Sequence, residues 1–128
     1  MIDLKKGIIK INNNLEFSPN FSYDDFKKTP YYNGQNNVRM IYLNEYQIIE
    51  GRKYMVSFFF KKDKIYMVSL VNCDEIISED NEKRRKKKHD NILSLEKIEN
   101  GKEYSWGKIQ SEFDARSNVS SINIYYKM

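Results

Sequence analysis

The sequence predicts an α+β fold. An antiparallel sheet, built as a meander of hairpins, carries one long helix packed on a face and follows a short N-terminal helix. Short apolar and aromatic runs recur through residues 38–71 and 104–126 with only a few polar residues between neighbours. Separations this short permit hairpins only, so adjacent strands should be antiparallel. Between these regions, residues 77–98 have helical composition without glycine or proline.

The N-terminal part of the chain predicts a hairpin followed by the short helix. Residues 7–17 contain two apolar runs around three asparagines, which is typical of a hairpin turn. Ser22 can cap a helix that Pro30 ends. Phe21 and Phe26 have the spacing of a hydrophobic staple, so they should pin this helix to the core.

Four runs predict the centre of the sheet, and they lie at 38–43, 46–49, 54–60 and 65–71. The sequence leaves open whether residues 38–49 form one bent strand or two. The runs 54–60 and 65–71 are apolar on both alternating sets of positions. We therefore expect them to pair at the sheet centre, with one face on a helix and the other partly covered by loops or a partner.

The long helix should extend over residues 77–98, with Ser78, Glu79 and Asp80 at its start and Asn100–Gly101 as its stop. The residues that supply its apolar surface lie in the last third, so we expect Ile92, Leu95 and Ile98, with Leu93 left open, to cover the sheet. The first half should project into solvent or fray, and the sequence does not decide whether the start is ordered.

Two further strands, at 104–113 and 119–126, should follow the helix and be joined by a turn at 114–118. No internal repeat or linker divides the chain, so residues 1–128 are expected to form one domain. The order of strands in the sheet is left open.

The charge of the chain is concentrated at one place. Six consecutive cations occur at 83–88, and the formal net charge is +4. Without these six of the 22 lysine and arginine residues, 16 remain against 18 acidic residues, which gives −2. Cys73 is the single cysteine, and no apolar run reaches the length of a signal peptide or membrane span. We expect a cytoplasmic protein with no membrane association.

The residue inventory argues against most catalytic sites. One histidine and one cysteine exclude the usual zinc cages, and the five glycines form no phosphate-binding loop. A Ser-His-Asp triad could be built only through His89. We therefore expect no enzyme, no cofactor and no metal.

The basic run permits two interpretations, and its residues are Lys83, Arg84, Arg85, Lys86, Lys87 and Lys88. It is either a solvated helix face paired with the preceding acids or a weak nucleic-acid contact. Because no aromatic residue occurs from Ser78 to Asp90, we expect no nucleic-acid binding at physiological salt. His89 precedes Ile92 by three residues, which favours a half-buried position at the edge of the core.

The C-terminal segment holds a more specific pattern. A tryptophan followed by glycine within a strand, Trp106–Gly107, indicates a bulge or a closely approached backbone. The segment reads Y-x-W-G-x-I-x-S-x-x-D-x-R and then S-x-I-x-I-x-Y, after an earlier HDNIL. Over His89–Tyr126 it resembles small uncharacterised bacterial domains, some encoded among toxin–immunity gene clusters. The resemblance implies structural framework roles for His89, Trp106, Gly107 and Asp114.

These observations favour a non-enzymatic binding protein of the immunity type, which would bind and occlude a protein partner of acidic or near-neutral charge. The alternative is a weak nucleic-acid-associated domain that uses residues 83–88. An enzyme that uses His89 and a nearby carboxylate is a third hypothesis. The partner's identity and the oligomeric state are left open.

Overall fold

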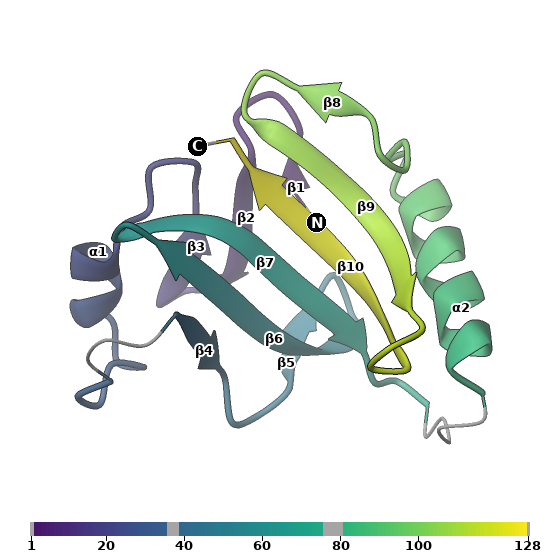
Figure 1. Cartoon of the computed structure of the whole chain (residues 1–128), viewed down its shortest axis with the longest axis horizontal. Helices are drawn as coiled ribbons and strands as arrows, with labels where there is room; N and C mark the ends of the chain where they lie inside the picture. Colours follow the sequence, from purple (N-terminus) through teal and green to yellow (C-terminus); the bar gives the residue numbers. More distant parts are fainter. Residues whose placement is uncertain (1, 36–38, 76–80, 128) are drawn as a thin grey trace.

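The computed structural model describes residues 2–35, 39–75 and 81–127, and it has the predicted α+β architecture with antiparallel sheets (Figure 1). A three-stranded sheet contains β1 (Ile2–Asp3), β2 (Ile8–Asn12) and β3 (Leu15–Phe17). A seven-stranded sheet contains β4 (Met40–Tyr42), β5 (Gln47–Ile49), β6 (Arg52–Lys61), β7 (Lys64–Asn72), β8 (Glu103–Tyr104), β9 (Gly107–Asp114) and β10 (Val119–Tyr126). The helices are α1 (Tyr23–Lys27) and α2 (Glu82–Leu95).

The larger sheet departs from a simple meander. Its strand order is β4-β6-β7-β10-β9-β8, with β5 also paired to β6, so the last strand inserts beside β7. The N-terminal hairpin belongs to the smaller sheet, which lies behind β7 and β10 in Figure 1. The region 38–49 forms two strands, β4 and β5, that pair with successive parts of β6, while residue 38 lies outside the described residues.

The central hairpin of β6 and β7 is confirmed. The two strands pair from Tyr54 opposite Asn72 to Lys61 opposite Lys64, with a register shift between Phe59 and Phe60 where Tyr66 of β7 is the extra residue. Their turn places Lys62 and Asp63 at φ 51° and 66°, the left-handed pair that a tight type I′ hairpin requires. The turn matches the strand twist and therefore fixes the register.

The short helix α1 begins as predicted. The Ser22 side chain accepts a hydrogen bond from the Asp25 N–H at 3.1 Å, and the Asp25 carboxylate accepts one from the Ser22 N–H at 3.0 Å. This reciprocal capping box satisfies two otherwise free backbone donors. Phe21 and Phe26 are both buried against Phe60, so the helix is fixed at its N-terminal end.

The end of α2 differs from the prediction. The helix stops at Leu95 because Lys97 turns into left-handed backbone at φ 59°. The Ile98 N–H then bonds to the Leu93 carbonyl at 2.8 Å, and the Lys97 N–H bonds to the Ser94 carbonyl at 3.1 Å. This is a Schellman motif, in which the apolar residue after the turn packs near the last helical turn.

That motif changes which residues cover the sheet. Ile92, Leu93 and Ile98 are buried, whereas the predicted contact residue Leu95 is 64 % exposed. The prediction for Leu95 is therefore wrong, because the helix presents it on the outer side. Leu93, left open by the sequence, takes the buried position.

The first half of α2 is also packed, contrary to expectation. Glu82 is only 6 % exposed, and its carboxylate accepts a hydrogen bond from the Ser120 N–H at 3.0 Å. The Ser120 hydroxyl donates to the Glu82 carbonyl at 2.6 Å. The helix start thus docks on β10. The predicted starting residues 78–80 lie outside the described residues.

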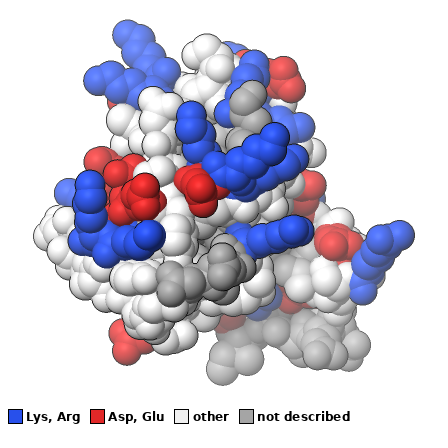
Figure 2. All heavy atoms as spheres, turned by 60° about the vertical axis from the view of Figure 1, so that its left-hand side comes forward, with Lys and Arg blue, Asp and Glu red and all other residues white. Residues whose placement is uncertain are grey.

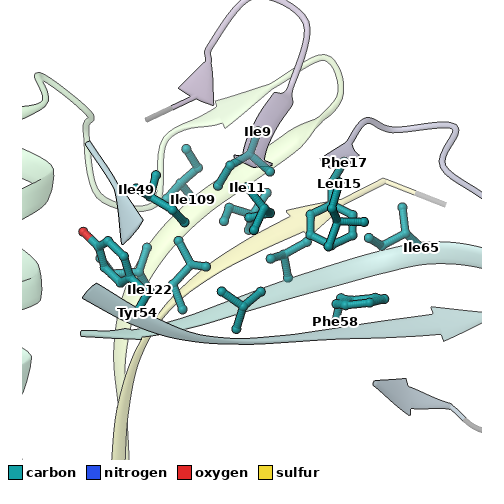
Figure 3. Close-up of a cluster of buried hydrophobic side chains, with 14 of the residues drawn as sticks. Ile9, Ile11, Leu15, Phe17, Ile49, Tyr54, Phe58, Ile65, Ile109 and Ile122 are labelled. Carbon is teal, nitrogen blue, oxygen red and sulfur yellow. The ribbon is translucent and has the colours of Figure 1, made fainter. Parts of the chain in front are cut away.

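The two sheets share one core. Side chains of the small sheet, such as Ile9, Ile11 and Phe17, point toward those of the large sheet, such as Phe58 and Ile122 (Figure 3). The rings of Phe17 and Phe58 lie 4.8 Å apart. At the other end of the same face, α2 lies beside β9 and β10 (Figure 1).

Candidate binding surfaces

One face of the seven-stranded sheet carries the contacts to other elements. Phe58, which packs on the small sheet, and Ser120, which bonds to α2, lie on the same face by strand register. The small sheet, α1 and α2 therefore share that face. No described element packs against the opposite face, which carries Met55 and Tyr125 and is called the open face below.

The open face is organised in rows that run across the strands. One row consists of directly opposed apolar residues, Met40, Phe59, Met67 and Tyr125. The neighbouring row is largely polar, with Tyr42, Ser57, Ser69, Asn123 and Gln110. Opposed residues on one face are near neighbours, so each row is a continuous strip.

The exposed apolar side chains are concentrated at one side of this face. Of the seven large hydrophobic residues with high exposure in the described part of the chain, five belong to the segment from β4 to β6, namely Met40, Tyr42, Tyr46, Ile48 and Met55. Tyr42 and Ile48 are 65 % and 62 % exposed. Single exposed hydrophobic residues are ordinary, but a contiguous group indicates a contact surface.

Tyr125, Asn123 and Glu112 form a hydrogen-bonded cluster on the other side of the open face. The Tyr125 hydroxyl donates to the Glu112 carboxylate, and the Asn123 amide donates to the same oxygen at 3.0 Å. Burial, and then the hydrogen bond to Glu112, raise the pKa of Tyr125 to about 12. Tyr125 therefore remains a neutral donor at physiological pH, and its ring is fixed in the apolar row.

The basic run lies along α2, and the structure pairs much of its charge. Four of its six cations contact described carboxylates: Arg84 with Glu75 (2.9 Å), Arg85 with Glu82 (2.7 Å), Lys86 with Asp90 (2.6 Å) and Lys88 with Asp74 (3.5 Å). Lys83 and Lys87 are exposed. Arg85 differs from the others because only 15 % of its side chain is exposed, so the run is not a uniformly solvated face.

Figure 2 shows the charges on the α1 side of the molecule. Lysine and arginine side chains there are separated by acidic and uncharged residues and do not merge into one cationic surface. This view therefore offers no broad electropositive platform for a polyanion.

His89 is buried completely, whereas the sequence predicted half burial. Its Nε2 accepts a hydrogen bond from the Asn72 N–H at 3.0 Å, so the neutral ring carries its proton on Nδ1. Burial, followed by the nearby charge of Arg85, lowers the pKa of His89 to about 4. At physiological pH the ring is neutral and ties α2 to the end of β7.

Trp106 and Gly107 lie where the two sheets meet. Trp106 is 6 % exposed, its Nε1 donates to the Leu4 carbonyl at 2.8 Å, and its ring stacks on Tyr104. A Cβ at Gly7 would collide with this ring, and one at Gly107 (φ 149°) would collide with the Tyr125 carbonyl. The predicted strand 104–113 is split, because Tyr104 of β8 pairs with Gly107 of β9 across a turn at Ser105 and Trp106. Trp106 therefore lies in a turn and not within a strand. Of the two arrangements expected for Gly107, close backbone approach is the one observed, because its pairing with β10 is regular.

Asp114 ends β9 and is exposed. Its Oδ1 accepts a hydrogen bond from the Arg116 N–H at 2.9 Å, and this bond leads the contacts that lower the pKa of the carboxyl. An aspartate that bonds two residues ahead shapes a turn. Asp114 is therefore the last residue of β9, and its side chain shapes the start of the turn to β10.

The described residues contain no cluster of three or more His, Cys, Asp or Glu side chains arranged to hold a metal ion. Within the same residues no helix has the length and apolar character needed to cross a membrane. No protein-family model, curated protein or solved structure matches the chain. The resemblance of the C-terminal segment to toxin–immunity-associated domains therefore remains a prediction from the sequence.

Sequence reasoning located the basic run but missed the open face as a site. The sequence did contain a signal for this face. The runs 54–60 and 65–71 are apolar at both alternating sets of positions, so they predicted that both faces of the sheet would be covered. What the sequence could not show is that no described element of this chain covers it. That depends on where the helices and the small sheet pack.

Proposed function

We propose that this protein is a non-catalytic binding module that occludes a protein partner, in the manner of an immunity protein, and that the open face is its contact surface. One observation carries the proposal: the row Met40, Phe59, Met67 and Tyr125 crosses a sheet face free of described packing elements. Methionine and aromatic residues are enriched at the centres of protein interfaces. A β-sheet presents them on a rigid support.

The placement of His89 favours a binding role over catalysis. The enzyme hypothesis depended on this residue, whose ring is buried and whose Nε2 is engaged by the Asn72 N–H. A general base must reach a substrate proton, and this nitrogen is already occupied. The proposed location is the cytoplasm, where a single unpaired Cys73 is ordinary.

The nucleic-acid alternative receives less support from the geometry. Binding to nucleic acid requires lysine and arginine side chains that can neutralise phosphates and displace their counterions. Four of the six cations in the run already contact carboxylates of this chain. The exposed aromatic residues of the open face lie on another part of the fold. A protein partner remains the better proposal.

The test compares two single substitutions that each place a glutamate at an exposed apolar position. Met55→Glu alters the open face, and Leu95→Glu alters the outer side of α2 at a residue that is even more exposed. Each variant and the unchanged protein serve as bait in native host extract. The retained partner is then purified, and its affinity and activity are measured with each variant.

We expect the unchanged protein and Leu95→Glu to bind the purified partner and suppress its activity. Met55→Glu should weaken binding by about thirtyfold or more, as loss of a central interface contact does. Equal binding by all three proteins would place the contact elsewhere. Binding that fails only when Lys83 and Lys87 are neutralised would support the basic run instead.

A further inference from the structure

The charges on the open face are unevenly distributed. Lys53 and Lys61 on β6 lie on the same side as Met55 by strand alternation, and Lys64 lies directly opposite Lys61. Toward the other edge, Lys108 is opposed by Glu103, and Glu112 holds Tyr125 and Asn123. The apolar group of the β4–β6 side is therefore bordered by lysines.

These three lysines differ from the four cations of α2 that contact carboxylates, namely Arg84, Arg85, Lys86 and Lys88. Among the described residues, no carboxylate forms an ion pair with Lys53, Lys61 or Lys64, and the Lys53 ammonium lies 4.9 Å from the Tyr46 ring centroid. Lys61 and Lys64 are exposed at the end of the central hairpin. The positive charges of Lys61 and Lys64 are thus available to a second molecule.

We infer, in an inference that rests on the proposed function, that the partner presents an acidic protein surface. Its carboxylates face Lys53, Lys61 and Lys64, and they surround an apolar centre that covers Met55 and Phe59. Charged residues at an interface rim accelerate encounter and reject partners of like charge. A basic partner would bring like charges against all three lysines. A second copy of this chain would also bring lysines against lysines wherever the lysine-bordered sides of the two copies met.

A peptide selection tests the charge preference directly, because it does not require the natural partner. Two displayed libraries of twenty-residue peptides share the same apolar residues, and one adds Asp and Glu while the other adds Lys and Arg. The unchanged protein is compared with Met55→Glu and with Lys53→Gln/Lys61→Gln. The matched control, Lys83→Gln/Lys87→Gln, removes the same charge from exposed positions on α2.

We expect acidic peptides to be enriched over basic ones by roughly tenfold or more at low salt, with the preference falling as added salt screens charge. Enrichment should be lost in Met55→Glu and reduced in Lys53→Gln/Lys61→Gln, while Lys83→Gln/Lys87→Gln retains it. Selection of neutral or basic peptides that still require Met55 would overturn the acidic preference and leave the proposed function standing.

Other outcomes identify other occupants of the open face. Peptide binding that is unchanged in Met55→Glu would contradict both the acidic preference and the proposed function. Sedimentation of the unchanged protein as a dimer that Met55→Glu dissociates would assign the open face to a second copy. Retention of a single-stranded oligothymidine at 150 mM salt, lost in Met55→Glu, would assign it to nucleic acid; each result overturns the acidic-protein inference.

Discussion

At the scale of single residues, Trp106 joins parts of the chain that are distant in sequence. Its indole donates to Leu4, stacks on Tyr104 and lies against Gly7. Tyr126 reinforces the same junction because its hydroxyl donates to the Gly7 carbonyl at 2.8 Å. The tryptophan therefore fastens the N-terminal sheet to the C-terminal strands.

Trp106→Ala should lower the free energy of unfolding by about 3–5 kcal/mol, the usual cost of deleting a large buried aromatic side chain. Trp106→Phe keeps much of the ring but removes the bond to Leu4, so it should cost less. Urea unfolding followed by circular dichroism measures both. An alanine variant with unchanged stability that no longer binds the proposed protein partner would instead make Trp106 part of the contact surface.

His89 should make the fold sensitive to mild acid. The unfolded chain takes up a proton near pH 6.5, whereas the folded chain resists protonation of His89 until about pH 4. Stability is therefore fully present above pH 6.5 and falls as the pH drops toward 4. At about 1.4 kcal/mol for each pKa unit, the loss approaches roughly 3 kcal/mol. Unfolding free energies measured from pH 7.5 to 4 should show this decline.

The single histidine also gives a direct check by NMR. Its ring signal in the folded protein should stay in the neutral position down to about pH 5, and titration near pH 6.5 would contradict the buried neutral state. Burial alone would raise the pKa of Asp90, but hydrogen bonds led by the one from Lys86 hold it below 3.8. His89→Gln, if folded, should flatten stability between pH 6.5 and 4.

At the scale of elements, α2 is held at several points along its length. Glu82 bonds to Ser120 near its start, His89 bonds to β7, and Arg52 of β6 contacts Glu96 at 2.9 Å just after its end. Each contact gives a hydrogen-bond or ion-pair partner to a polar or charged group at the interface between α2 and the sheet. The basic run is thus carried by a docked helix.

The cations of α2 should differ sharply in their effect on stability. Replacing Lys83, Arg84, Lys86 and Lys87 by Gln should cost at most about 0.5 kcal/mol each, because exposed charges and ion pairs contribute little. Arg85→Gln should cost about 3–5 kcal/mol, because it leaves the buried Glu82 carboxylate without its cation. Urea unfolding and amide exchange of α2 would measure both effects, and equal small losses would show that the Arg85–Glu82 pair contributes no stability.

At the scale of the whole molecule, one apolar cluster connects both sheets and α2. We expect the chain to unfold in one cooperative step, as small single domains usually do. Trp106, the only tryptophan, reports on the junction with the small sheet, while circular dichroism reports on all strands. The two urea transitions should coincide. A fluorescence change at lower urea would show that the N-terminal sheet detaches first.

Much of the fold could be predicted because its signals are local. The hairpin of β6 and β7 follows from two apolar runs and a short turn, and α1 follows from Ser22 and its cap. The length and docking of α2 were predicted less well. Glu82 has the appearance of a surface residue, and only Ser120 and Arg85 beside it make its burial possible. Leu95 has the appearance of a core residue, and the direction of the helix exposes it.

The sequence by itself determined the central hairpin of β6 and β7, the start of α1 and the absence of a familiar catalytic motif, because these depend on residues that are close along the chain. Only the tertiary structure decided that β10 inserts beside β7, that the N-terminal hairpin forms its own sheet, and that both α2 and this sheet pack on one face. These choices depend on contacts between distant residues, such as Trp106 with Leu4 and Ser120 with Glu82. The open face exists because those contacts all lie on the opposite side.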